Sequence, residues 1–192
     1  VGKSTVFNAL TGMKQHTGNW AGKTVAGAEG FLNIGEDSFR LVDIPGTYSL
    51  IAHSHEEEVA SDIICFSHPD GVVVVCDAGC LERNLNLAIQ ILEVTGNVVI
   101  CCNLIDEAAH AGITVDADAL SEKLGCPVVL TAARNKIGLD ELKEAMALLK
   151  NGDNRPPLVL DYGKEVEEQI SALIPLMPRE LNARWCALRM IE

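Results

Sequence analysis

Two short runs of β-branched and apolar residues, separated by a helical pattern, most constrain the fold of this chain. Residues 71–76 read Gly-Val-Val-Val-Val-Cys and residues 98–102 read Val-Val-Ile-Cys-Cys. Such runs are typical of strands buried on both faces, which occur in parallel sheets covered by helices. Between the runs, apolar residues recur at helical spacing and stop before a glycine: Leu81, Leu85, Ala88, Ile89, Leu92 and then Gly96. This alternation predicts an α/β domain, a three-layer sandwich with a mostly parallel sheet.

The rest of the chain up to about residue 150 fits the same plan. Helices are predicted over residues 4–10, 56–66, 117–124 and 139–149, the first of them stopped by Gly12, and a further strand over residues 128–131. Residues 24–34 and 38–44 alternate well enough to predict a β-hairpin around a turn at 35–37. The polar stretches 14–23 and 45–55 are predicted to be loops.

Residues 151–157, Asn-Gly-Asp-Asn-Arg-Pro-Pro, are the best candidate for a domain boundary. Beyond them a helical stripe is followed by two prolines and a last helix: Val166, Ile170, Leu173, Ile174, Pro175 and Pro178. We therefore expect an α/β domain over residues 1–150 and a small helical subdomain over residues 151–192. Because the chain begins with Val1 and stops at Glu192 within a helical pattern, we expect the natural protein to continue in both directions.

Charge and composition exclude several classes of function. The chain has 15 Lys and Arg against 27 Asp and Glu, and the net charge of −12 opposes general binding to nucleic acids. Its apolar runs are far shorter than the roughly 18 residues that cross a bilayer, so this part of the protein is expected to be soluble. Seven cysteines, an odd number and several of them in apolar runs, indicate a reduced, cytosolic chain.

The sequence Gly2-Lys3-Ser4 opens the first predicted helix and matches the end of a phosphate-binding loop. In that pattern backbone N–H groups surround phosphates, the lysine reaches the β and γ oxygens, and the hydroxyl ligates Mg²⁺. The alternative for these residues alone is a helix start with a capping serine.

Two further motifs follow predicted strands. Asp43 and Gly46 come after the hairpin, where a carboxylate can hold a magnesium-bound water and a glycine N–H can meet a γ-phosphate. Asn103 and Asp106 close a buried strand, and a carboxylate at Asp106 can accept hydrogen bonds from N1 and N2 of guanine, which adenine cannot donate. Taken singly these patterns also suit an ordinary turn and a strand-to-helix cap. Their order at the carboxyl ends of strands predicts a guanine-nucleotide site.

The chain resembles the small-GTPase superfamily, and within it the cytosolic G domain of the prokaryotic ferrous iron transporters of the FeoB family. Four segments carry the resemblance: residues 18–25 (Gly-Asn-Trp-Ala-Gly-Lys-Thr-Val), 43–50 (Asp-Ile-Pro-Gly-Thr-Tyr-Ser-Leu), 77–85 and 103–108. It extends to Arg184 and Trp185, which are similar to the end of the family's GDI-like helical subdomain. The resemblance implies a GTP-hydrolysing domain that lacks its first strand and the start of its phosphate-binding loop here.

The resemblance assigns roles to individual residues. It implies that Lys3, with Gly2 and Thr5 beside it, binds the phosphates of GTP or GDP, and that Gly46 senses the γ-phosphate. Ser4 and Thr24 would ligate Mg²⁺, and Asp43 would hold it through water. Asn103 and Asp106 would select guanine, and the backbone of Thr131, Ala132 and Ala133 would meet the guanine carbonyl, with Ala132 in place of the family's serine.

No catalytic side chain is identified by these comparisons of motifs. Thr47 stands after Gly46, where Ras-like enzymes carry a water-orienting glutamine, so slow intrinsic hydrolysis is expected. Thr24, Gly46 and Thr47 are the switch candidates, and K⁺ is expected near Trp20. Because the phosphate-binding loop is incomplete, this chain should bind nucleotide more weakly than its full-length parent.

The expected partners are the guanine nucleotide and a membrane transport domain of the same polypeptide at the cytoplasmic face of the inner membrane, with a homo-oligomer allowed and nucleic acid excluded. Two rival functions remain open: a soluble K⁺-stimulated GTPase in RNA modification or ribosome assembly, and a sensor that binds guanine nucleotide without hydrolysis. His53 and His55, beside three glutamates, could form a metal site or the solvated start of an acidic helix. The second interpretation is favoured, because acidic residues stabilise a helix N-terminus. Trp185 is expected in a core seam of the helical subdomain.

Overall fold

The structure is a computed structural model of the 192-residue chain, and it describes residues 2–12, 15–19, 26–51, 54–150, 155–178 and 180–191. Its central sheet is parallel, with the strand order β4-β5-β6. The strands are β4 (Val72–Asp77), β5 (Val98–Asn103) and β6 (Val128–Leu130). A second, antiparallel sheet has the order β1-β2-β3, with β1 (Gln15–Asn19), β2 (Ala26–Ile34) and β3 (Asp37–Asp43).

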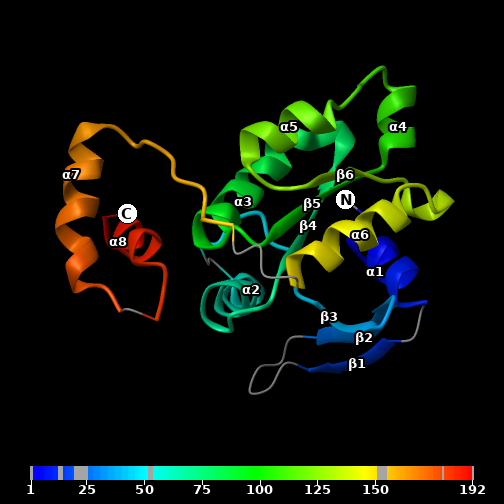
Figure 1. Ribbon diagram of the computed structural model, residues 1–192, viewed down its shortest axis with the longest axis horizontal. Coiled ribbons are helices and arrows are strands. Elements are labelled where there is room, and N and C mark those ends of the chain that lie inside the picture. The colour runs from blue at the N-terminus through cyan, green and yellow to red at the C-terminus, as the bar shows by residue number, and fades with distance from the viewer. Residues whose placement is uncertain are drawn as a thin grey trace.

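Helices cover both faces of the parallel sheet (Figure 1). The α-helices are α1 (Lys3–Thr11), α2 (His55–Phe66), α3 (Leu81–Val94), α4 (Ile105–His110), α5 (Ala117–Leu124), α6 (Leu139–Lys150), α7 (Lys164–Leu173) and α8 (Ala183–Ile191). Three short 3₁₀ turns accompany them in the described residues: η1 (Ala78–Cys80), η2 (Ala133–Asn135) and η3 (Ile174–Leu176).

Strand β5 shows why its sequence is apolar throughout. Val98 and Ile100 belong to a core cluster that includes residues of α2, α3 and α5. Val99 and Cys101 belong to a second cluster, formed with residues of α1, α6, β2 and β3. Alternate side chains of a strand point to opposite faces, so a strand with helices on both sides needs apolar residues at every position. The predicted α/β fold with a parallel sheet is confirmed.

Most predicted elements lie within two residues of the observed ones, and the main exception is β1. Residues 15–19 were expected in a loop but pair antiparallel with residues 26–30 of β2. The segment is polar and carries no alternation, so only its main-chain pairing with β2 makes it a strand. The short helix α4 was also not predicted, because six residues are too few to show helical periodicity.

The C-terminal helices α7 and α8 form a small unit beside α2 and α3 (Figure 1). Ile170, Ala187 and Leu188 make its own buried cluster. Trp185 lies outside this cluster, because its ring packs in the large core and meets Phe66 of α2 edge-on, with ring centroids 6.3 Å apart. The seam expected inside the helical subdomain therefore runs between α8 and α2.

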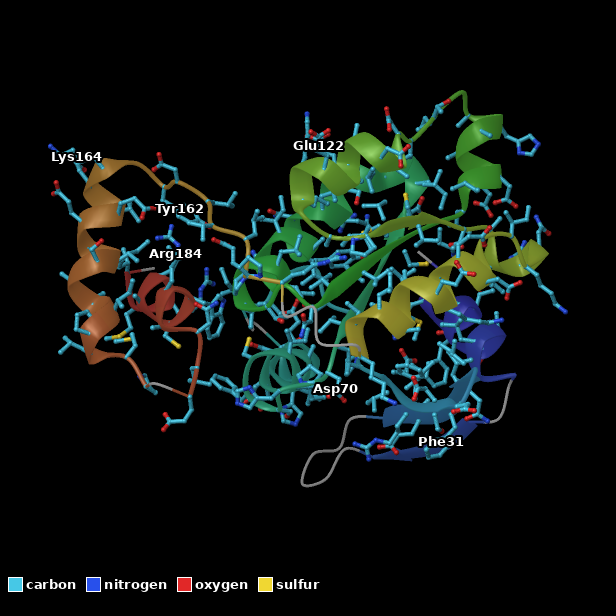
Figure 2. All side chains as sticks on the ribbon, in the orientation of Figure 1. Phe31, Asp70, Glu122, Tyr162, Lys164 and Arg184 are labelled. Carbon is cyan, nitrogen blue, oxygen red and sulfur yellow. The ribbon has the colours of Figure 1, made fainter. Side chains whose placement is uncertain are left out.

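An ion pair fixes the inside of this helical unit. Arg184 of α8 donates to both carboxylate oxygens of Glu167 on α7, at 2.8 and 2.7 Å, and to Leu160 O at 2.6 Å. Figure 2 labels Arg184 and Tyr162 on the side of this unit that is turned towards α3. The hydrogen bonds from Arg184 lower the pKa of Glu167 to about 2, so the pair stays charged at neutral pH.

Candidate nucleotide-binding site

The start of α1 lies directly against the end of β5. Gly2 has a left-handed backbone with φ of 73°, and a Cβ added there would lie 2.6 Å from Asn103 Nδ2. Only glycine satisfies both the dihedral angle and this close approach. The first and third sequence motifs, about a hundred residues apart in the chain, are therefore neighbours in space.

Lys3 joins the first motif to the second. Its Nζ pairs with Asp43 Oδ1 at the end of β3 and donates to Ile44 O at 2.9 Å. Ser4 and Thr5 are exposed in the first turn of α1, beside Lys3. The side chains of Lys3 and Asp43 are 36% and 20% exposed, so solvent can reach the lysine at the start of the helix.

The loop after β3 is tied to α2 and α3. Gly46 is exposed, while Thr47 Oγ1 donates to Ser49 O at 2.5 Å and lies 3.4 Å from Glu57 Oε1 of α2. Gln90 of α3 accepts hydrogen bonds at Oε1 from Leu50 N at 2.7 Å and from Ser49 Oγ at 3.1 Å. The role of Gln90 could not be predicted from sequence, because a single polar residue beside a helical stripe does not indicate a partner 40 residues away.

Asn103 is a buried connection between the ends of β5 and β6. It is 1% exposed, and its Oδ1 accepts from Thr131 Oγ1 at 3.0 Å and from Ala133 N at 3.1 Å. Thr131 is fully buried and also lies 3.3 Å from Cys101 Sγ. Asn103 thus fixes the turn that follows β6 relative to α1 and α4.

Asp106 stands in the first turn of α4 with one carboxylate oxygen engaged and one not. Oδ2 accepts from Asn135 Nδ2 at 2.8 Å, whereas Oδ1 is buried and has no hydrogen-bond partner among the described residues. A buried carboxylate oxygen without a donor is costly, because its hydration has been lost and nothing replaces it. The arrangement suits a ligand that brings N–H donors to this carboxylate.

The backbone predicted to meet a guanine carbonyl is already hydrogen-bonded within the protein. Ala132 N donates to Ile137 O at 3.1 Å, and Ala133 N donates to Asn103 Oδ1. Contact of Ala133 N with a ligand would therefore be shared with Asn103. The structure brings Gly2, Lys3, Asp43, Asn103 and Asp106 together, whereas Thr24 and Trp20 lie outside the described residues.

The other candidate metal site does not form in the described part of the chain. His55 Nδ1 lies 3.0 Å from Glu58 Oε2, and the side chain of Ser54 caps α2 by accepting from Glu57 N. Both contacts fit the favoured interpretation, the start of an acidic helix. His53 is outside the described residues. Among the residues described, no group of three or more His, Cys, Asp or Glu side chains could hold a metal ion.

The chain has a parallel sheet covered by helices, a glycine-lysine helix start against the end of β5, an aspartate paired with that lysine and an Asn-Asp pair after β5. Together these features define the P-loop GTPase fold. The comparisons with known proteins agree. The family model for ferrous iron transport protein B matches residues 1–146. The Fe(2+) transporter FeoB of Escherichia coli strain K12 is 36% identical over 198 residues, covering the whole of this chain and 25% of that protein. This chain belongs to the FeoB family.

Solved structures show the same fold over nearly the whole chain. The cytosolic domain of T. maritima FeoB, in a GDP form, is 37% identical with a TM-score of 0.93, covering 98% of this chain and 76% of that one. The cytosolic domain of L. pneumophila FeoB is 33% identical with a TM-score of 0.90, covering 97% and 75% of the two chains. The chain spans about a quarter of the length of the curated relatives. Among the described residues, no helix has the length and apolar character to cross a membrane.

Proposed function

We propose that this chain is the guanine-nucleotide-binding part of a ferrous iron transporter, and that it hydrolyses GTP to GDP and phosphate. The observation that carries the proposal is the buried, unpaired Oδ1 of Asp106 beside the hydrogen-bonded Oδ2. Guanine offers N1–H and N2–H side by side, and both carboxylate oxygens keep lone pairs for them. Adenine would leave Oδ1 without a donor, so the site would discriminate against ATP.

The phosphates would lie at the start of α1. Gly2, Lys3 and Thr5 present backbone N–H groups there, and Lys3 adds a positive charge. The Lys3 pair with Asp43 keeps the ammonium at the mouth of the site, and an incoming phosphate would compete for it. Ser4 and Asp43 offer the hydroxyl and carboxylate oxygens that Mg²⁺ prefers, and bound Mg²⁺ would neutralise charge on the β and γ oxygens. Thr24 as a further ligand, and K⁺ near Trp20, belong to the same proposal.

Hydrolysis is proposed to be slow. Thr47 turns its hydroxyl into its own loop, onto Ser49 O, and has no amide that would orient an attacking water. Gly46 is exposed one residue earlier, and we propose that its N–H contacts the γ-phosphate. This chain's own contribution would then be binding and orientation rather than general-base catalysis.

We propose that the change between the GTP-bound and GDP-bound states is transmitted to the helical unit through α3. Gln90 holds the loop after Gly46, and Glu93, one turn along α3, accepts from Tyr162 Oη at 2.8 and 2.9 Å. Asn182 adds hydrogen bonds to the carbonyls of Glu93 and Val94 at 2.8 and 3.1 Å. A shift of the loop would therefore pull on the helix end that holds the helical unit.

Replacing Gln90 by Ala tests this route. In the full-length protein, amide hydrogen exchange of residues 161–169 should differ between the GDP form and a form with a non-hydrolysable GTP analogue. We expect Q90A to abolish that difference while GDP affinity changes less than about threefold, because Gln90 does not touch the nucleotide site. The matched control is N86A, an exposed amide one turn earlier on α3. A nucleotide-dependent difference that persists in Q90A would disprove the route.

The remaining roles concern the whole protein. We propose that residues 1–150 form the G domain and residues 151–192 a helical subdomain. This subdomain would relay the nucleotide state to a membrane domain at the cytoplasmic face of the inner membrane. Family membership and the net charge of −12 favour iron transport over RNA modification or ribosome assembly.

Nucleotide titration of the full-length protein tests the proposed function. We expect GDP to bind at least about 100-fold more tightly than ADP, because ADP leaves Oδ1 of Asp106 without a donor. We also expect multiple turnovers of phosphate release from GTP. Equal affinity for GDP and ADP would refute the guanine assignment. Tight GDP binding without phosphate release would leave the alternative of a sensor that does not hydrolyse.

A further inference from the structure

Asn135 lies at the end of the turn that follows β6, 29 residues beyond Asp106 in sequence. Its Nδ2 donates to Asp106 Oδ2 at 2.8 Å. This is the hydrogen bond that the structure gives to the Asp106 carboxylate, and it leaves the buried Oδ1 as the oxygen still needing a donor. Asn135 itself is exposed, so its amide holds the carboxylate from the outer side of the site.

A carboxylate rotates easily about its Cβ–Cγ bond, because this torsion has a broad energy profile. To accept from N1–H and N2–H together, Asp106 must hold its two oxygens in the plane of the base. One fixed hydrogen bond at Oδ2 sets that plane. Because each oxygen has two lone pairs, Oδ2 can accept from Asn135 and from a ligand at once.

The turn that carries Asn135 is itself anchored. Asn135 N donates to Ala132 O at 2.9 Å, and Ala133 N donates to Asn103 Oδ1 at 3.1 Å. Asn103 is connected to Asp106 a second way, through the left-handed residue Leu104, whose φ is 65°. The hydrogen bond from Asn135 to Asp106 completes this set of contacts. The carboxylate is therefore held in position by its own helix α4 and by η2.

We propose that Asn135 is a positioning residue for base recognition, which aligns Asp106 with the N1–H and 2-amino group of guanine. The inference rests on the proposed function and deepens it. No sequence pattern indicates Asn135, since the Ala-Arg-Asn-Lys stretch at 133–136 resembles an ordinary polar turn. Its effect should be specific to the 2-amino group, because that contact depends most on the carboxylate being held in plane.

The test compares GDP with IDP, which lacks the 2-amino group, in calorimetric titrations of the full-length protein. We expect the unaltered protein to bind GDP about tenfold more tightly than IDP, the worth of one hydrogen bond to a charged group. In N135A, GDP affinity should fall about tenfold and IDP affinity less, so that the preference for GDP falls to about twofold. N135D, which keeps the size but removes the donor and adds a repelling charge, should lose at least as much.

The control is R134A, an exposed neighbour in the same turn, which should leave both affinities and their ratio unchanged. A turn that merely stabilises the fold would weaken GDP and IDP equally, so an unchanged ratio in N135A would overturn the inference. N135D binding like the unaltered protein would overturn it as well. If the unaltered protein shows no preference for GDP over ADP, the proposed function fails instead.

Discussion

Replacing Asp106 by Asn is expected to change which base the protein prefers. An amide in place of the carboxylate meets the N–H groups of guanine with its own NH₂, so one favourable contact becomes a repulsive one. Xanthine carries a carbonyl where guanine has the 2-amino group, so it matches an amide. We expect GDP affinity to fall about 100-fold and XDP to become the better ligand, measured by calorimetry on the full-length protein.

The control for this change is D140N, which removes the same charge from an exposed residue at the start of α6. It should leave both affinities unchanged. Because the comparison is between two nucleotides in one variant, a general loss of folded protein cannot imitate a reversal. A D106N protein that still prefers GDP to XDP would show that Asp106 does not read the base.

The outline of the fold could be predicted because burial on both faces leaves a local signature. The runs at 71–76 and 98–102 lie in strands with core clusters on both faces, and such strands require apolar side chains at consecutive positions. Alternation and a turn at residues 35–37 predict the hairpin of β2 and β3, and the observed turn is one residue shorter, with Ile34 opposite Asp37. In both cases the residues that determine the structure are adjacent in sequence.

The parts that could not be predicted depend on contacts between distant residues. Strand β1 is polar and forms through main-chain pairing with β2, which no side-chain pattern records. Gln90 and Asn135 act on partners 40 and 29 residues away. Trp185 was assigned to a helical core, yet it packs on α2, because periodicity shows which face of a helix is apolar and not what covers it.

The candidate site was predictable as a set of motifs but not as a network. The order of the motifs, each at the end of a strand or the start of a helix, predicts that Lys3, Asp43, Asn103 and Asp106 form one site. In the structure Lys3 pairs with Asp43, and Gly2 lies against Asn103. The structure also shows two features that sequence motifs do not indicate. These are the contact of Gly2 with Asn103 and the different surroundings of the two Asp106 carboxylate oxygens.

Replacing Lys3 by Ala should nearly abolish nucleotide binding while leaving the fold intact. Hydrogen bonds from an ammonium to phosphate are charge-assisted, so their loss should weaken GDP binding about 100-fold in calorimetric titrations of the full-length protein. The same change breaks the Lys3 pair with Asp43, but both side chains are partly exposed, so the melting temperature should fall by only about 3 °C or less.

The matched control for the lysine is K143A, which breaks the 2.7 Å pair of Lys143 with Asp140 on α6. Both variants remove one lysine from an aspartate, and only Lys3 stands at the start of α1. GDP affinity should therefore separate them by about 100-fold while their melting temperatures stay close. If K3A bound GDP as tightly as K143A, the phosphates would have to lie away from the start of α1. The placement of the base at Asp106 would then have to be judged on the nucleotide comparison alone.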